Sequence, residues 1–194
     1  MAVKNFSPHA TGSGYVRFNN ANWNTCRGAS NGNYEAAGIY VTCSHTGTEY
    51  FINRSFLSFN TSTLTAGAKI TAATITATWT LDKNEDNDGK DFGSIVLSTQ
   101  ADPTDMAIAD FDQAGSTEGS NRIDITGISG SQVFTLTETG RGWISKTGYS
   151  TFALREGHDL LNEAIANSTS NQALLTNIVL SVTYTLPAGF FAIL

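Results

Sequence analysis

Hydrophobic and polar residues alternate most regularly in segment 54–81, RSFLSFNTSTLTAGAKITAATITATWTL. After Gly67, small or apolar residues alternate with threonine, at Ala73, Ile75, Ala77, Trp79 and Leu81. A period of two is typical of a β-strand with one face on a core and the other in water. A helix is disfavoured because β-branched threonine loses side-chain entropy there and packs well on a pleated sheet. The segment therefore predicts a strand, a short loop at TSTLTAG and a long strand.

Similar short apolar segments, separated by Gly, Asn and Ser, occur on both sides of this region. They predict strands within 1–7, 14–28, 39–43, 49–60, 92–100, 131–137, 149–159 and 177–186, with 14–28 forming two short strands around a turn. Residues 108–111 predict one helical turn. Residues 137–148 predict a short helix that is capped at Thr137 or Thr139 and ends at Gly148.

Many short strands with turn residues between them favour a sandwich. We therefore predict an all-β fold, a single antiparallel β-sandwich of jelly-roll type with one short helix. This domain is expected to span 1–186, and residues 187–194 form an apolar C-terminal tail. A chain of 194 residues is long enough for such a core without a metal or disulfide scaffold.

The composition excludes some classes of function. The formal net charge is −6 and only 14% of the residues are charged, with no basic patch, so nucleic-acid binding is not expected. No stretch of about 20 apolar residues predicts a membrane span. The segment MAVKNFSPHATGSG lacks the apolar core of a secretory signal, so we expect synthesis in a cytoplasm without a signal peptide.

The chain has two cysteines, Cys26 and Cys43. In the absence of an oxidising compartment, two buried free thiols are expected. A disulfide between neighbouring strands is the alternative.

Four segments in a fixed order carry a resemblance to a known family: 54–75, 109–117, 134–160 and 178–185. An Arg-Ser strand ending in Phe-Asn-Thr-Ser precedes an Ala/Thr-rich strand, and a Lys-Thr-Gly turn precedes a strand that ends in Arg and is followed by Asp. These positions are Arg54, Ser55, Phe59, Asn60, Thr61 and Ser62, then Lys146, Thr147, Gly148, Arg155 and Asp159.

The set resembles the DNRLRE, or disaggregatase-related, β-sandwich domains, especially those of structural proteins from tailed phages and viral metagenomes. The resemblance implies a jelly-roll sandwich in a virion or cell-surface context, and it does not imply an enzyme. Asn60 stands where the family usually has an acidic residue, and residues 1–49 match less well.

Arg54 and Arg155 lie in or at the ends of apolar strands. Their guanidinium groups are expected to be buried and paired, that of Arg155 with Asp159 or Glu156, because a planar fork suits carboxylates and carbonyls. A contact with a sugar or receptor is the alternative.

The loop 82–91, DKNEDNDGKD, places oxygen ligands at alternate positions, as calcium loops do, at Asp82, Asn84, Asp86 and Asp88. A helix–loop–helix calcium site is excluded, because Ile95 stands where that pattern requires Glu and the flanking segments are strands. Two possibilities remain, a looser Ca²⁺ site and a solvated hairpin tip; no other cofactor is expected.

Other catalytic chemistry has little support in the sequence. His9, His45 and His158 show no ligand spacing, which argues against zinc. Nucleophile-elbow, phosphate-loop and dinucleotide motifs do not occur. A hydrolase pair among Asp102, Asp105, Asp110 and Asp112 stays open, although surface acids are the common case.

The three tryptophans are assigned different roles. Trp79 lies on the apolar face of its strand and is expected in the core, and Trp143 is expected to anchor the short helix. Trp23, in an Asn-rich turn, is a candidate platform for a glycan.

The tail LPAGFFAIL is the clearest functional feature outside the sandwich. Phe190, Phe191, Ile193 and Leu194 are predicted either to pack back as a last strand or to bury against a partner.

Our leading hypothesis is a non-enzymatic virion protein of a bacteriophage, a capsid decoration or part of a fibre or spike. It would self-associate, with a trimer favoured, and contact other virion proteins such as the major capsid protein. A carbohydrate- or receptor-binding module is the alternative, and a lyase or hydrolase fragment is the third.

Overall fold

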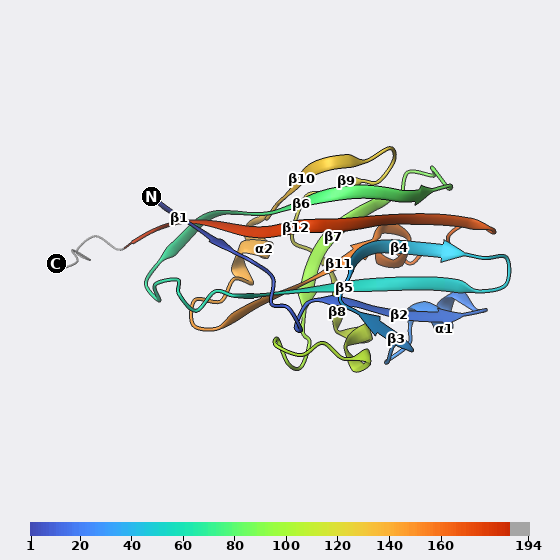
Figure 1. Ribbon diagram of the computed structural model, residues 1–194, viewed down its shortest axis with the longest axis horizontal. Coiled ribbons are helices and arrows are strands. Elements are labelled where there is room, and N and C mark those ends of the chain that lie inside the picture. The colour runs from blue at the N-terminus through green and yellow to red at the C-terminus, as the bar shows by residue number, and fades with distance from the viewer. Residues whose placement is uncertain (187–194) are drawn as a thin grey trace.

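Twelve antiparallel strands build the protein, whose computed structural model describes residues 1–186 (Figure 1). The strands are β1 (Ala2–Phe6), β2 (Gly14–Asn20), β3 (Tyr34–Ala36), β4 (Ile39–His45), β5 (Tyr50–Asn60), β6 (Lys69–Asn84), β7 (Phe92–Ser98), β8 (Ala114–Glu118), β9 (Ile123–Asp124), β10 (Ser129–Thr135), β11 (Tyr149–Glu156) and β12 (Thr169–Thr185). Four short helices connect them: α1 (Trp23–Arg27), the 3₁₀ helix η1 (Ile108–Gln113), α2 (Glu138–Gly142) and α3 (Gly157–Leu161).

The strands form one curled sheet in the order β10-β6-β12-β4-β5-β11-β7-β8. The β4–β5 hairpin joins the two halves of this order, and an isolated bridge between Ser120 and Leu136 brings the opposite edges together. The curled sheet therefore encloses its apolar face as a sandwich does, and the predicted all-β, jelly-roll-like fold is confirmed.

The first hydrophobic core lies inside the curled sheet. The alternate residues of β6 contribute to it as predicted, with Ala73, Ile75, Ala77 and Trp79 all buried. The intervening threonines Thr74, Thr76 and Thr78 are more exposed. One face of β6 is therefore on a core and the other faces outward.

A second core covers the outer face of β5, β11 and β7. Phe56 and Ile52 of β5 pack there with Phe111 of η1 and Leu160 of α3, while Leu57 of β5 belongs to the first core. Strand β5 is thus buried on both faces, unlike β6. The alternation after Gly67 predicted one face in water for β6 only, and the second face of β5 is covered by β2 and the short helices.

The helices differ from the prediction in number and extent. Residues 14–28 form β2 and α1 rather than two strands around a turn, because Asn22 caps a helix by accepting a hydrogen bond from Thr25 N. Thr137 caps α2 as expected, but α2 ends at Gly142, well before Gly148. A further helix, α3, begins within the predicted strand 149–159. The helical turn predicted at 108–111 is confirmed as η1.

Both ends of the described chain lie at the same end of the molecule (Figure 1). β1 pairs with the last part of β12, so that Ala2 lies opposite Tyr184. No helix in the part of the chain that the structure describes is long and apolar enough to cross a membrane.

Candidate functional site

Helix α3 places two consecutive titratable residues, His158 and Asp159, in different surroundings. Both are fully buried. The helix begins where β11 ends, because the carboxylate of Glu156 accepts a hydrogen bond from His158 N at 2.7 Å and caps the first turn. Asn162, in the left-handed conformation, ends the helix. The tight β11–α3 corner therefore fixes both side chains.

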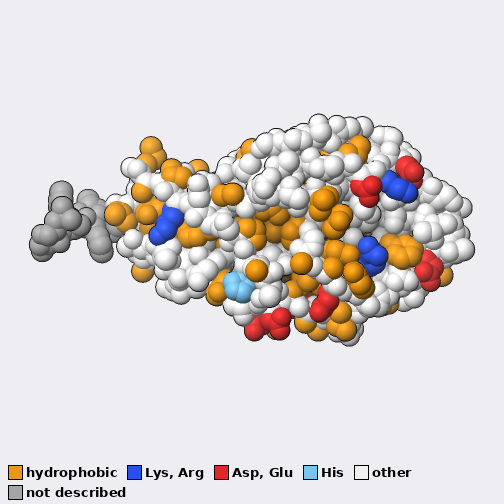
Figure 2. Space-filling view, viewed as in Figure 1, with side chains coloured by type: hydrophobic (Ala, Val, Ile, Leu, Met, Phe, Trp, Pro, Cys, Tyr) orange, Lys and Arg blue, Asp and Glu red, His pale blue; other side chains and the backbone are white. Residues whose placement is uncertain are grey.

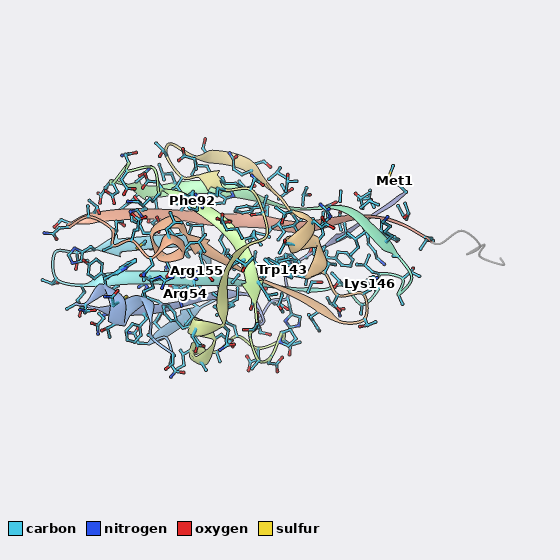
Figure 3. The ribbon with its side chains drawn as sticks, turned by 180° about the vertical axis from the view of Figure 1, so that it is seen from behind. Met1, Arg54, Phe92, Trp143, Lys146 and Arg155 are labelled. Atoms are coloured by element: carbon cyan, nitrogen blue, oxygen red, sulfur yellow. The ribbon has the colours of Figure 1, made fainter. Side chains whose placement is uncertain are left out.

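Arg54 and Arg155 lie near one another on β5 and β11 (Figure 3). Asp159 forms ion pairs with both, and we call Arg54, Arg155 and Asp159 the arginine cluster. Arg54 donates to both carboxylate oxygens at 2.9 and 2.7 Å, and Arg155 donates to both at 2.7 Å. Burial opposes the ionised carboxylate, but the two guanidinium charges outweigh it and hold the pKa of Asp159 well below its usual range. The prediction that both arginines are buried and paired is confirmed, with Asp159 as the partner of Arg155.

The remaining donors of the two arginines are also satisfied. Arg54 donates to the carbonyl oxygens of Phe111 and Arg27, and Arg155 to those of Gly115 and Asp159. Every guanidinium nitrogen of Arg54 and Arg155 thus has an acceptor, which indicates a structural role for the cluster.

His158 lies against the loop between β6 and β7, and we call Asp86, Asp88 and His158 the loop–helix cluster. His158 Nε2 is 3.2 Å from Asp86 Oδ2 and 3.4 Å from Asp88 Oδ2. It nevertheless has no hydrogen-bond partner among the described residues. The side chain of Asp88 is 31% exposed, whereas those of Asp86 and His158 are 9% and 0% exposed, so the cluster opens to water on the Asp88 side.

Glu156 orients the imidazole ring of His158. His158 Nδ1 donates to Glu156 Oε1 at 2.8 Å, which turns Nε2 toward the two aspartates. Burial disfavours the charged ring, but Glu156, Asp88 and Asp86 more than offset burial, so the pKa of His158 is raised. Burial also raises the pKa of Glu156. The surroundings of His158 are therefore strongly negative.

The four predicted calcium ligands do not converge. Asp86 and Asp88 lie close together, but Asp82 is at an exposed position of β6 and accepts a hydrogen bond from Gln172. Asn84 lies opposite Asn171 in the β6–β12 pairing, and the Oδ1 atoms of both have no hydrogen-bond partner in residues 1–186. The four predicted residues therefore do not form a single calcium site.

Sequence reasoning missed His158. The absence of ligand spacing among the histidines argued against zinc, yet His158 meets Asp86 and Asp88 through the fold and not through local spacing. The Arg-Glu-Gly-His-Asp sequence at the end of β11 was the available signal, because a strand that turns abruptly into buried charged residues needs partners for them.

The other candidate residues have structural surroundings. Trp79 is buried in the first core, as predicted, and Trp143 follows α2 and packs against Phe152. Trp23 begins α1, is half-buried and packs edge-on against Tyr50 at 5.3 Å between ring centroids. The expected exposed turn is thus a helix, and Trp23 contributes to the second core.

Two of the four aspartates of segment 101–113 accept hydrogen bonds from backbone N–H groups, and Asp112 accepts one from the side chain of Gln113. Asp110 accepts from Ala107 N at 2.9 Å, and Asp102 accepts from Thr104 N at 2.8 Å. Cys26 and Cys43 are both buried free thiols, as expected. Phe190, Phe191, Ile193 and Leu194 lie outside the described residues.

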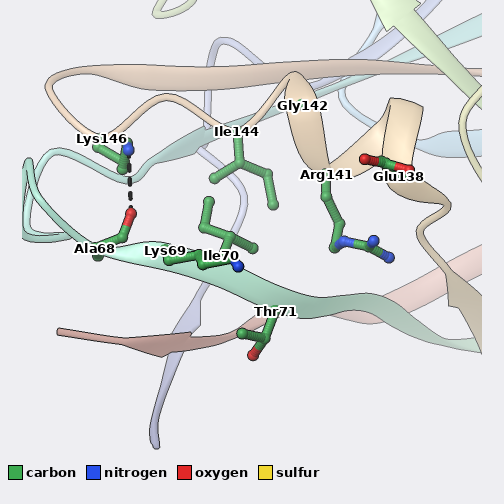
Figure 4. A pocket seen from close by; sticks show the side chains of 9 residues that line it. All are labelled: Ala68, Lys69, Ile70, Thr71, Glu138, Arg141, Gly142, Ile144 and Lys146. Atoms are coloured by element: carbon green, nitrogen blue, oxygen red, sulfur yellow. Dashed lines mark hydrogen bonds between the residues drawn. The ribbon is translucent and has the colours of Figure 1, made fainter. Parts of the chain in front are cut away.

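A groove of about 560 Å³ lies between the start of β6 and the α2 region (Figure 4). Its lining is Ala68, Lys69, Ile70, Thr71, Glu138, Arg141, Gly142, Ile144 and Lys146. Lys146 Nζ donates to the carbonyl oxygen of Ala68 at 3.1 Å across the groove. Three cations and one carboxylate make this groove basic in a chain of net charge −6.

The chain matches no model of a known protein family, and no curated protein matches it either. The resemblance to the DNRLRE domains therefore stays a prediction.

Proposed function

We propose that the chain is a non-enzymatic structural protein of a bacteriophage particle, either a capsid decoration or part of a fibre or spike. It associates with further copies of itself, and with other virion proteins such as the major capsid protein, and is exposed on the particle surface. The sequence resemblance and the jelly-roll-like fold support this role.

One observation carries the proposal of self-association. The core-facing residues of β12 are fully buried at Leu180 and Val182 and half-buried at Tyr184, and Leu186, which follows β12 in the same alternation, is 45% exposed. Within residues 1–186, the inner face of the sandwich is thus uncovered at this end, and we call the region of Tyr184 and Leu186 the open end. At the same end of the molecule Met1 and Val3 are exposed, with Val3 on the outer face because it pairs with Thr183, and apolar side chains gather there in Figure 2.

An uncovered inner sheet face is a surface that a second copy can cover. The basic groove adjoins it, because Ile70 lines the groove and pairs with Tyr184. A second copy of this acidic chain offers carboxylates to Lys69, Arg141 and Lys146. The charge of the groove and the apolar surface of the open end therefore both favour a second copy of the chain as the partner.

The solution mass, measured by light scattering, tests self-association. We expect a closed oligomer, with a trimer favoured, for the unchanged chain and a shift toward monomer for Leu186→Glu. Val133→Glu is a matched control, because Val133 is also 45% exposed but lies on β10. A monomer at about 100 μM, or an equal effect of both substitutions, would contradict the proposal.

The place in a particle is tested separately. In particles purified from a phage that encodes the chain, antibody labelling is expected on the outer surface. Absence of the chain from such particles, together with specific binding on a glycan array, would instead favour the carbohydrate- or receptor-binding alternative.

A further inference from the structure

The loop–helix cluster has the donors, the charge and the geometry of a metal site. We propose that it binds one divalent first-row transition-metal ion, with Zn²⁺ as the representative, through Asp86 Oδ2, Asp88 Oδ2 and His158 Nε2. The ion ties the β6–β7 loop to α3, at the end of the molecule away from β1 (Figure 1).

The strongest observation is the buried Nε2 atom of His158. A buried polar atom without a hydrogen bond costs free energy, and a native structure normally provides a partner. Asp86 and Asp88 flank Nε2 at 3.2 and 3.4 Å, but neither forms a hydrogen bond with it. A metal on the lone-pair axis of the ring would satisfy Nε2 and hold both carboxylates to the sides.

The distances fit such an ion. Ligand atoms that share a tetrahedral ion at 2.0–2.1 Å lie about 3.3–3.4 Å apart. The two separations between His158 Nε2 and the aspartate oxygens, 3.2 and 3.4 Å, are close to that value, and all three donor atoms lie within 4.8 Å of one another. A small shift of side chains is therefore sufficient to complete the coordination.

The donors favour a transition metal over calcium. Ca²⁺ prefers six to eight oxygen ligands, whereas imidazole nitrogen suits Zn²⁺, Cu²⁺, Fe²⁺ and Ni²⁺. The nearest ligands here include a histidine, and Asp82 of the sequence-predicted loop accepts from Gln172 instead. Three protein ligands leave a coordination position for water on the exposed Asp88 side.

Glu156 supplies the supporting contact that metal-bound histidines usually have. Such a histidine donates its other ring N–H to a carboxylate or carbonyl, which fixes the tautomer and raises the basicity of the ligand. His158 Nδ1 donates to Glu156 Oε1 at 2.8 Å, and Glu156 also holds His158 N. The ring is thus oriented for metal binding before an ion arrives.

Lys90 competes with the ion. Its Nζ lies 2.7 Å from Asp88 Oδ2 and 2.8 Å from Glu163 Oε2. Binding of the ion requires Lys90 to share or release Asp88. Because exposed ion pairs contribute about 0.2–1 kcal/mol, removal of Lys90 is expected to tighten metal binding by about 1.4–5-fold.

Calorimetric titration of metal-free protein with Zn²⁺ tests the proposal. We expect one ion per chain, a rise of Tm with Zn²⁺ concentration, and no comparable effect of Ca²⁺. Titration with Co²⁺ gives an independent signal, since low coordination with a nitrogen ligand produces visible absorption bands.

Matched variants locate the site. Asp86→Asn, Asp88→Asn and His158→Gln are each expected to weaken Zn²⁺ binding by more than about 100-fold, and Glu156→Gln by about 10–100-fold. Asp82→Asn, in the same acidic segment, is expected to change it less than about 2-fold, and Lys90→Gln is expected to tighten it. Circular dichroism checks folding, and the exposed Asp88 variant stays informative if His158→Gln does not fold.

Three outcomes overturn the proposal. One is the absence of Zn²⁺ and Co²⁺ uptake at about 100 μM by the unchanged chain, which would leave His158 as a charged ring shared between two aspartates. Another is Zn²⁺ uptake that Asp86→Asn and Asp88→Asn do not weaken. The third is preferential uptake of Ca²⁺.

Discussion

The arginine cluster and the loop–helix cluster begin at consecutive residues of α3 but differ in how completely their polar atoms are paired. Asp159 accepts from two arginines in a bidentate manner and sits within the second core. His158 satisfies Nδ1 with Glu156 but leaves Nε2 without a hydrogen bond, next to a loop that is open to water.

This difference in pairing distinguishes buried charges that stabilise the fold from those that are available to a ligand. In the arginine cluster every strong donor has an acceptor of opposite charge or a carbonyl, so its effect is on stability. In the loop–helix cluster, negative groups converge on an unpaired nitrogen, so its effect is on binding. The two clusters therefore predict mutants with different signatures.

The largest effect is expected from Asp159→Asn. The substitution preserves shape but leaves Arg54 and Arg155 buried beside a neutral amide, and breaking a buried pair in this way costs about 3–5 kcal/mol. The free energy of unfolding, from urea denaturation, is the measurement. A loss below about 1 kcal/mol would show that the arginines find other partners and that the cluster is not essential for stability.

A smaller effect is expected from His158→Gln in metal-free protein. The change removes the Nδ1 hydrogen bond to the buried carboxylate of Glu156, which typically costs about 1–3 kcal/mol. Unlike Asp159→Asn, the substitution keeps the carboxylate that pairs with Arg54 and Arg155. The same urea titration in the presence of a chelator measures it, and a loss greater than that of Asp159→Asn would reverse the comparison.

The sequence predicted the parts of this arrangement that depend on local patterns. The alternation after Gly67 identified β6, and the strand-terminal Arg155 followed by Asp159 identified one ion pair. The contacts of Arg54 with Asp159 and of His158 with Asp86 depend on how α3 packs against other segments. Such packing cannot be predicted from the local alternation of polar and apolar residues. The covering of β5 by a second core was missed for the same reason, because both faces of a doubly buried strand are set by distant segments.

Each cluster also has a nearby buried thiol. Burial, followed by the charge of Asp159, raises the pKa of Cys26 to about 12, and burial with Glu156 raises the pKa of Cys43. Above pH 9 the unfolded thiols ionise while the folded ones keep their protons. The unfolded state then binds fewer protons, so the free energy of unfolding falls as pH rises.

At pH 10 this loss is expected to be about 1.4–2 kcal/mol for each thiol. Urea denaturation at pH 8 and pH 10 measures it, with the double variant Cys26→Ala and Cys43→Ala as the control that lacks the thiol contribution. A native protein that reacts rapidly with a thiol reagent at pH 8 would contradict the burial on which the expectation rests.

The smallest effect is expected from Arg122→Gln, which tests an ion pair at the surface. Arg122 donates to both oxygens of Glu118, as the arginines of the core do to Asp159, and its guanidinium lies 4.2 Å from the centre of the Phe92 ring. Its side chain is 46% exposed, however, so water already solvates the charges and screens their attraction. A loss below about 1 kcal/mol is therefore expected in urea denaturation. Because the hydrogen-bond geometry matches that of the arginine cluster, an equal loss at both sites would mean that geometry, and not burial, sets the stability of these pairs.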